Sequence, residues 1–521
     1  MLIYFKQYTH SSLTILSLSL LFFISSCKGQ KKEYDKSRPP NIVIILADDL
    51  GYGDIGYYNE NSLIPTSNLD KLASEGISLT NAYCPIAVCS PTRYALMTGT
   101  YPWRSWNESG VMRNYERSMI EKDQLTLPAM LKQNGYVTAG FGKWHLGTSF
   151  QTTDGQHPVG YGMFKADKNG ANLDITKPVH DGPIDHGFDK WLGFSCASEC
   201  WILDGKKIVA ILDHPYYTTE AAQGTEHLEA IAMEDYLSYI TNSSLNFIRE
   251  QSTETSPFFL YFAPYVPHTP LAPSENFKNK TQAGQYGDYV NELDDSVGQL
   301  LNALAENNLT DNTIVLFASD NGSAFKISYK GIEDSDKRNR GGGHPVDIDN
   351  YPTKESLNPN GFIAHYPNGN LKGAKSTAWE GGVRTPLIVR WPKQIPAGIK
   401  SHQLFALNDV MPSLAGILNI VLPDDAALDG FDLTGVLKGE YKGLRRSVIV
   451  QSSNNIFGLR MGKWKFIHGS KRDHNSATDE LYDLSIDPSE SKNLLKESPE
   501  IAKMMKRELL KLLNSKRTNF N

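Results

Sequence analysis

The feature that most constrains the fold of this 521-residue chain is a set of short apolar runs, each followed by Gly, Asp or His and then by helical periodicity. The clearest runs are Asn41–Ala47, Val137–Phe141, Phe258–Ala263 and Thr313–Ala318. Helix-like stretches, such as Leu127–Asn134 and Tyr289–Asn307, lie between them. Strands that alternate with helices are typical of α/β units around a parallel sheet. We therefore expect an α/β fold.

Polar side chains follow each of these four runs. They are Asp48 and Asp49, Lys143 and His145, His268, and Asp320 and Asn321. Ligands of open α/β sheets bind beyond the carboxyl ends of the strands, so these are candidate site residues. Taken singly, each has another interpretation, since acids and histidines at strand ends often cap a helix or hydrogen-bond within a loop. Their arrival at one edge of one sheet favours a functional site.

The chain exceeds the size at which single cores usually stop growing, so a large domain with a smaller partner is expected. Near residue 430 the pattern changes to short strands, Ser447–Gln451 and Lys463–His468, and a final amphipathic helix near Glu500–Leu513. This pattern predicts a catalytic domain over residues 41–429 and a smaller α+β domain over residues 430–521. The segment from Gly322 to Gly373 is polar and has no convincing period.

Charge and composition exclude some classes of protein. Lys and Arg number 52 against 58 Asp and Glu, a formal net charge of −6, and 40% of the residues are hydrophobic. This composition is that of a globular protein, not a disordered one. No basic block points to nucleic acid as a partner. An anionic substrate would have to be bound by positive charge concentrated in the site, because the net charge cannot attract it from a distance.

The first 27 residues predict an export signal, with Lys6 as the only charge and an apolar stretch over Leu13–Ile24. The stretch is too short and too rich in Ser for a membrane span, which needs about 20 apolar residues. The end of the signal, Ile24–Cys27, resembles a bacterial lipobox, which implies lipidation of Cys27. We expect an exported, membrane-anchored lipoprotein facing the periplasm or the cell surface, with residues 28–40 as a tether. A plain secretory signal is the alternative.

Lipidation would remove Cys27 from disulfide pairing. Cys196 and Cys200 could pair in an oxidising compartment, although sequence alone cannot show it. Cys84 is most simply a small buried side chain.

Cys89 begins the segment CSPTRYALMTG, which predicts a turn running into a helix, with Pro91 in its first turn. Cys89 would then lie near the helix N-terminus, where free N–H groups and the helix dipole favour an anion. Arg93, four residues later, falls on the same helix face. A reactive or structural thiol is the alternative interpretation of Cys89.

This segment resembles the signature of formylglycine-dependent (type I) sulfatases of the alkaline phosphatase superfamily, in which a maturation enzyme oxidises the Cys to formylglycine. The resemblance covers nearly the whole chain from Asn41 onward. The other matching motifs are Asp48-Asp49, Gly142-Lys143-Trp144-His145, Pro267-His268, Asp320-Asn321-Gly322, and Lys375 followed by Glu380–Arg384. The resemblance implies a large mixed, mostly parallel sheet flanked by helices, with the smaller α+β domain at the C-terminus.

The resemblance also implies roles for these residues. One metal ion would be held by Asp48, Asp49, Cys89, Asp320 and Asn321. The oxygen ligands suit Ca²⁺ or Mg²⁺ and argue against zinc, and the family favours Ca²⁺. Lys143 and Lys375 would bind sulfate oxygens, and Arg93 would hold the formylglycine. One hydroxyl of the hydrated formylglycine would attack sulfur while His268 protonates the leaving alcohol; His145 would then take the proton that regenerates the aldehyde.

Export and a lipid anchor favour a sulfated polysaccharide, or oligosaccharides derived from it, as substrate. Arg338, Arg340 and His344 are candidate substrate-binding residues, since Arg suits bidentate contact with carboxylate or sulfate groups; a solvated loop is the alternative. Two other functions compete. A phosphodiesterase or phosphonate hydrolase of the same superfamily is disfavoured by the intact Cys motif. A non-catalytic glycan-binding lipoprotein is disfavoured because no catalytic residue is missing.

Overall fold

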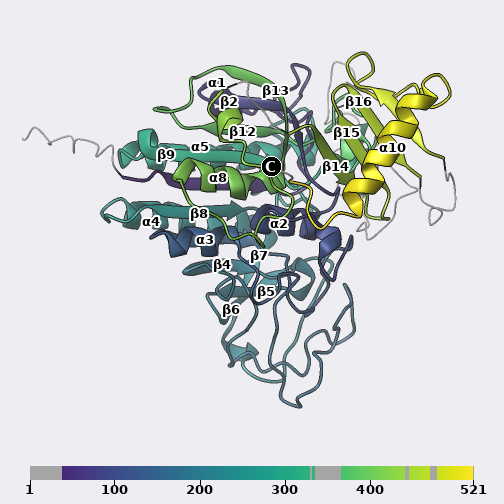
Figure 1. The fold of residues 1–521 in the computed structure, drawn as a ribbon. Helices are drawn as coiled ribbons and strands as arrows, with labels where there is room; N and C mark the ends of the chain where they lie inside the picture. Colours follow the sequence, from purple (N-terminus) through teal and green to yellow (C-terminus); the bar gives the residue numbers. More distant parts are fainter. Residues whose placement is uncertain (1–37, 329–330, 335–364, 441–444, 470–477, 520–521) are drawn as a thin grey trace, which may run out of the picture. The chain divides into compact units, whose positions relative to one another are not determined.

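The fold is built on one sheet of eleven strands in the order β13-β2-β12-β9-β1-β8-β3-β4-β5-β6-β7 (Figure 1). The structure is a computed structural model that describes residues 38–328, 331–334, 365–440, 445–469 and 478–519. The strands of this sheet are β1 Asn41–Ala47, β2 Ile77–Tyr83, β3 Val137–Lys143, β4 Lys190–Phe194, β5 Trp201–Asp204, β6 Lys207–Asp213, β7 Glu229–Ala232, β8 Phe258–Ala263, β9 Thr313–Ser319, β12 Leu387–Arg390 and β13 Ile399–Ala406.

The four strands predicted from sequence are neighbours at the centre of the sheet. β1 pairs in parallel with both β9 and β8, and β8 pairs in parallel with β3. Their carboxyl ends therefore meet at one edge. The sheet is mixed because β12 runs antiparallel to β2 and β9, and β5 antiparallel to β4 and β6. The predicted fold class is confirmed.

Helices cover both faces of the sheet. In β1, Ile42, Ile44 and Leu46 belong to one hydrophobic core, while Val43, Ile45 and Ala47 belong to the other. The first core contains residues of α2 (Cys89–Thr98), α3 (Leu127–Gln133) and α8 (Val410–Leu418). The second contains residues of α1 (Ser67–Ser74), α4 (Met233–Gln251) and α5 (Gly284–Glu306). Because strand side chains alternate and both faces are buried, the central strands are continuous apolar runs.

A second, four-stranded antiparallel sheet lies near the C-terminus. It consists of β14 Ser447–Gln451, β15 Phe457–Met461, β16 Trp464–His468 and β17 Glu480–Asp483. Helix α10 (Pro499–Leu513) lies beside this sheet (Figure 1). Its Met505 and Leu509 belong to the same hydrophobic core as Leu459 and Phe466 of the sheet. The predicted α+β character of this region is confirmed; the boundary at residue 430 stays a prediction.

Two short strands, β10 (Phe325–Ser328) and β11 (Gly331–Asp334), form a hairpin in the polar segment for which the sequence predicts no regular structure. Four candidate residues, Cys27, Arg338, Arg340 and His344, lie outside the described residues. Within the described part of the chain, no helix is long and apolar enough to cross a membrane.

Candidate active site

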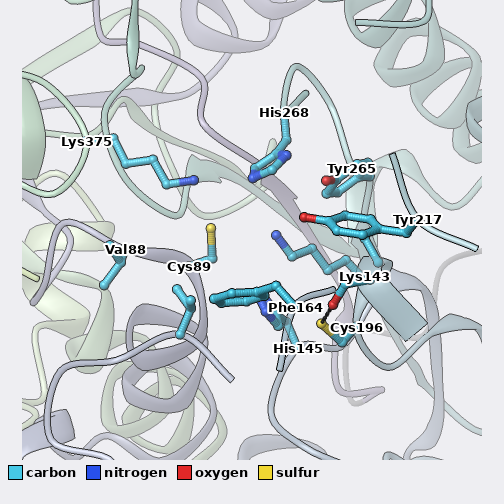
Figure 2. Close-up of a pocket in the computed structure, with 13 residues that line it drawn as sticks. Val88, Cys89, Lys143, His145, Phe164, Cys196, Tyr217, Tyr265, His268 and Lys375 are labelled. Carbon is cyan, nitrogen blue, oxygen red and sulfur yellow. Dashed lines mark hydrogen bonds between the residues drawn. The ribbon is translucent and has the colours of Figure 1, made fainter. Parts of the chain in front are cut away.

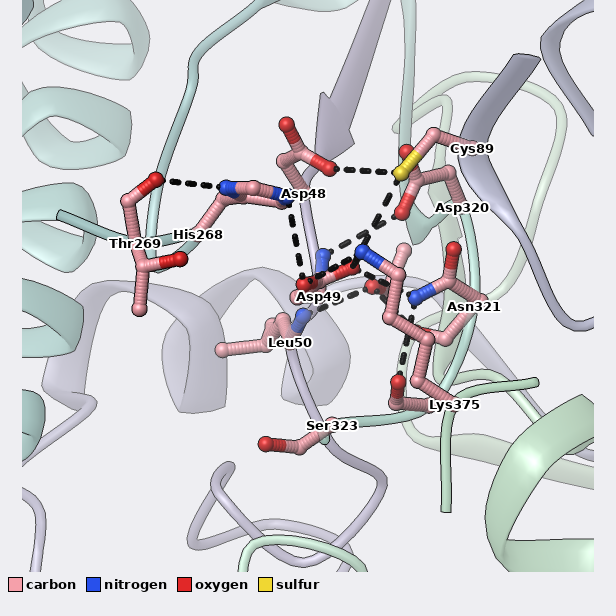
Figure 3. A network of polar contacts seen from close by, with 12 residues as sticks. Asp48, Asp49, Leu50, Cys89, His268, Thr269, Asp320, Asn321, Ser323 and Lys375 are labelled. Carbon is pink, nitrogen blue, oxygen red and sulfur yellow. Dashed lines mark hydrogen bonds and ion pairs between the residues drawn. The ribbon is translucent and has the colours of Figure 1, made fainter. Parts of the chain in front are cut away.

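Two neighbouring strands deliver the acidic residues of the site (Figure 3). Asp48 and Asp49 follow β1, and Asp320 and Asn321 follow β9. The Asp49 backbone N–H donates to Asp320 Oδ1 at 3.2 Å, and Asn321 Nδ2 donates to Asp49 Oδ1 at 2.7 Å. Gly322 is required next, because a Cβ there would lie 1.9 Å from the Gly381 carbonyl oxygen.

Cys89 is the first residue of α2 and is buried beside these acids. Its Sγ lies 3.3 Å from Asp48 Oδ1 and 3.9 Å from Asp49 Oδ1. Burial and the carboxylates of Asp320 and Asp48 raise the pKa of the thiol well above its ordinary value. The unmodified side chain is therefore a neutral thiol, which is a weak nucleophile.

Three cations surround the same acids. Arg93 donates from Nη2 to Asp320 Oδ2 at 2.8 Å, Lys143 from Nζ to Asp48 Oδ2 at 2.6 Å, and Lys375 from Nζ to Asp49 Oδ2 at 2.7 Å. Arg93 also donates to the Lys143 carbonyl at 3.0 Å, which fixes the two cations relative to each other. The site thus pairs three cations with three carboxylates. A metal ion bound by the carboxylates would give it the excess positive charge that binding an anion requires in a chain whose net charge is negative.

The pKa values of the carboxyl groups reflect this crowding. Burial raises the pKa of Asp48, but Lys143, His268 and Arg93 lower it more, so that it lies well below its ordinary value. Burial and the Asp48 charge raise the pKa of Asp320 to about 7, despite the opposing effect of Arg93. Carboxylates this close repel one another until a cation lies among them.

The two histidines are fixed in complementary tautomers. His145, at φ 59°, has Nε2 3.1 Å from the Met112 carbonyl, so Nε2 carries the proton. Its Nδ1 is buried and has no hydrogen-bond partner among the described residues. His268 donates from Nδ1 to the Thr269 carbonyl at 2.7 Å, while its Nε2 lies 3.7 Å from Asp49 Oδ2. His145 therefore keeps Nδ1 for chemistry, while the Nε2 of His268 faces the Asp49 carboxylate.

Burial lowers the pKa of both imidazoles. Together with Lys143, it holds the pKa of His145 well below the ordinary value, and together with Lys375 it lowers that of His268 to about 4. Both rings are neutral in the protein alone. A neutral His145 is ready to accept a proton, whereas His268 must gain one before it can donate.

The carboxylate and amide oxygens of the site fit a hard divalent cation, whereas the Cys89 thiol and the His268 imidazole beside them are softer donors. Asp48, Asp49, Cys89 and His268 offer ligand atoms within 4.8 Å of one another. The Asn321 Oδ1 is buried and has no hydrogen-bond partner among the described residues, so this amide has an oxygen to give to an ion. Carboxylate and amide oxygens are the ligands that Ca²⁺ and Mg²⁺ prefer.

A pocket opens above these groups (Figure 2). Predicted residues that line it are Cys89, Lys143, His145, His268 and Lys375. Arg93 and the acids lie beneath, around Cys89. The sequence did not indicate the remaining wall: Val88, Val111, Phe164, Cys196, Ala197, Ser198, Tyr217 and Tyr265. Of these residues, Tyr265 could have been suspected from the sequence, because it lies three residues before His268. In the structure, the Lys143 ammonium lies 5.1 Å from the centre of its ring.

Cys196 and Cys200 are both buried, free thiols, so the structure does not contain the disulfide that the sequence left open. Cys196 Sγ instead lies 3.1 Å from the Ser198 hydroxyl. Cys84 is also buried and free, and its Sγ donates to the Val383 carbonyl at 3.3 Å.

The chain is similar to known sulfatases over almost its whole length. Residues 40–420 match the Sulfatase family, and residues 374–517 match the N-sulphoglucosamine sulphohydrolase C-terminal family. An N-acetylgalactosamine-6-O-sulfatase of Bacteroides thetaiotaomicron is 32% identical, covering 94% of this chain and 96% of that protein. Human arylsulfatase A is 30% identical, covering 88% and 84%.

A solved structure from a study of glycosaminoglycan metabolism by Bacteroides thetaiotaomicron superposes with a TM-score of 0.75 at 30% identity, covering 91% of this chain and 99% of that one. The two family matches together span both sheets, since residues 40–420 include β1 to β13 and residues 374–517 include β14 to β17. This chain belongs to the sulfatase family, and it is a sulfatase.

Proposed function

We propose that this sulfatase removes sulfate esters from sugars, with formylglycine formed from Cys89 and one bound Ca²⁺, and that its substrates are sulfated polysaccharides or oligosaccharides derived from them. The observation that carries the proposal is the convergence of Cys89, three cations and two histidines on one pocket edged by acids. The similarity to an N-acetylgalactosamine-6-O-sulfatase favours a 6-sulfated amino sugar as the sulfated unit.

Lys143 and Lys375 bind the sulfate oxygens. Both ammonium groups line the pocket on either side of Cys89 (Figure 2), so a sulfate seated over residue 89 meets both. Arg93, buried behind them, is bound to Asp320 and orients residue 89. Ca²⁺ would be held by the side-chain oxygens of Asp48, Asp49, Asp320 and Asn321, and when bound it would help to stabilise the charge on the transferring sulfuryl group.

Formylglycine supplies the nucleophile that a buried neutral thiol cannot. A hydrated aldehyde carries two hydroxyls on one carbon, one for attack on sulfur and one from which a proton can be removed later. His268 Nε2, next to Asp49, is placed to protonate the leaving alcohol oxygen. Binding of the anionic sulfate favours the protonated ring, since a nearby negative charge raises a histidine pKa. The free Nδ1 of His145 accepts the later proton.

We extend the proposal to the location of the enzyme and to its maturation. The N-terminal pattern supports export, lipidation of Cys27 and anchoring to a membrane, and the Cys89 segment supports recognition by a formylglycine-generating maturation enzyme. Labelling of cells with a lipid precursor tests the lipidation of Cys27, because Cys27→Ala should abolish incorporation of the label into the protein. Arg338, Arg340 and His344 stay candidates for contact with sugars beyond the sulfated one.

Desulfation of a panel of sulfated mono- and oligosaccharides by Cys89→Ala and Cys84→Ala protein tests the proposal. Cys84 is a matched control, because it is a buried thiol that does not line the pocket. We expect wild type and Cys84→Ala to release sulfate from at least one sugar and Cys89→Ala to release none. Cleavage of an aryl phosphate diester in preference to every sulfate ester would overturn the proposal in favour of the phosphodiesterase alternative.

A further inference from the structure

An arginine that none of the proposed catalytic steps uses lies against Phe164, one of the residues that line the pocket. Arg113 is exposed, and its guanidinium carbon lies 5.5 Å from the centre of the Phe164 ring, which lines the pocket. Its Nη1 donates to the Gly162 carbonyl at 3.3 Å. Among the described residues, no carboxylate lies within ion-pairing distance of this guanidinium. A cation with unused N–H donors thus faces solvent beside the pocket.

This arginine is held in place from the catalytic side. Asn114 donates from its backbone to the Met163 carbonyl at 3.1 Å, and Gly162 to the Asn114 carbonyl at 2.9 Å, which joins the two segments that carry Arg113 and Phe164. The preceding residue, Met112, gives its carbonyl to His145 Nε2 at 3.1 Å. The backbone segments that carry Arg113 and Phe164 are therefore joined to each other and to the His145 ring, so that binding of a ligand has to order only the Arg113 side chain.

The chemistry of this wall fits a sugar chain that leaves the pocket. Phe164 and Tyr217 are aromatic lining residues, and Figure 2 shows the Tyr217 hydroxyl turned toward the middle of the pocket. Aromatic faces and a phenol hydroxyl suit the apolar face and hydroxyls of a sugar ring. Arg113 lies beyond them and suits a planar, bidentate contact with a carboxylate or a sulfate.

We propose that Arg113, held against the ring of Phe164, binds an anionic group on the sugar next to the sulfated one, so that the enzyme prefers acidic oligosaccharides to isolated sulfated sugars. This inference rests on the proposed sulfatase action on sugars. It assigns the anion by its chemistry alone, as either a uronate carboxylate or a second sulfate.

The test compares kcat/KM on four substrates that share one sulfated sugar: the monosaccharide, a disaccharide with a neutral neighbour, a disaccharide whose neighbour carries a carboxylate, and one whose neighbour carries a sulfate. Arg113→Met keeps an apolar stem over Phe164 and removes the charge. Arg117→Met is the matched control, an exposed arginine of the same segment that stacks on Trp106 at 4.9 Å and pairs with Glu121, away from the pocket lining.

We expect Arg113→Met to lower the ratio of kcat/KM for the acidic disaccharide to that for the monosaccharide by roughly ten- to a hundredfold, mainly through KM. Arg117→Met should leave this ratio within about twofold of wild type, as is usual for a surface charge. The two acidic disaccharides show which anion is bound. An unchanged ratio in Arg113→Met, or an equal fall in both variants, overturns the inference. If wild type cleaves none of the sugars, the proposed function itself is wrong.

Discussion

Lys465 of β16 offers a sharp test of how the C-terminal sheet is joined to the catalytic part. Its Nζ donates to Glu380 Oε1 at 2.9 Å and lies 3.1 Å from Glu490 Oε1, and all three side chains are fully buried. Glu380 begins α7 (Glu380–Val383), five residues after Lys375. Lys465→Met removes the cation and leaves two buried acids facing a methyl group.

Removal of one partner from a buried ion pair typically costs about 3–5 kcal/mol. Arg384 remains 3.6 Å from Glu380, and burial already raises the pKa of Glu490 to about 7, so that it can take up a proton. We therefore expect the lower limit, about 3 kcal/mol. Residues Pro39–Asn521 form one compact unit. At about 2 cal/mol/K of unfolding entropy per residue, a unit of this size unfolds with an entropy of about 1 kcal/mol/K. A loss of about 3 kcal/mol in the free energy of unfolding therefore lowers the melting temperature by about 3 °C.

Calorimetry at pH 8 measures this shift, with Lys463→Met as the matched control. Lys463 precedes β16 and pairs with Asp483 at 2.6 Å, but its side chain is 54% exposed. An exposed pair contributes at most about 1 kcal/mol, so the control should shift by less than about 1 °C. A Lys465→Met shift no larger than that of Lys463→Met would refute the view that this buried ion group fastens the two parts.

Three further outcomes follow from the site and its surroundings. His268→Ala should slow a sugar sulfate far more than an activated aryl sulfate, whose leaving group needs no proton; equal slowing would remove His268 from the role of general acid. Chelation by EGTA should abolish sulfate release and lower the melting temperature, and Ca²⁺ should restore both better than Mg²⁺; indifference to chelation would contradict the metal site. Because the folded-state pKa of Glu490, about 7, lies above its ordinary value of 4.5, wild type loses stability as pH rises through that window. As the pH is raised from 5 to 8, the melting temperature of Glu490→Gln should therefore rise relative to that of wild type. A difference in melting temperature that stays constant over this range would show that Glu490 does not titrate there.

Much of the central fold could be predicted because its strands are buried on both faces. Burial on two sides makes β1, β8 and β9 continuous apolar runs with clear ends, and the polar residues at those ends identify one edge of the sheet. The sequence analysis did not predict β2 and β12, for two different reasons. β2 (Ile77–Tyr83) contains Ser, Thr and Asn and resembles a loop, while β12 (Leu387–Arg390) has only four residues.

The pocket wall could not be predicted, because nothing local in the sequence places it. Phe164 and Tyr217 lie in loops outside any helix or strand, and the loop of Phe164 is held by backbone hydrogen bonds to distant residues, such as Asn114 to Met163. The buried pair of Asp54 and His365, 2.8 Å apart, is likewise formed by residues far apart in the chain. Such contacts depend on tertiary packing alone. The roles assigned to the residues in the pocket stay predictions.

The central claim is that residue 89 acts as formylglycine, and intact-peptide mass spectrometry combined with activity tests it most directly. Protein made with and without a maturation enzyme would be digested, and the peptide containing residue 89 compared with the rate of sulfate release from the best sugar substrate. We predict that the peptide loses the elements of H₂S and gains one oxygen, and that activity rises in proportion to the converted fraction. Full activity from protein in which residue 89 is entirely Cys would contradict the account.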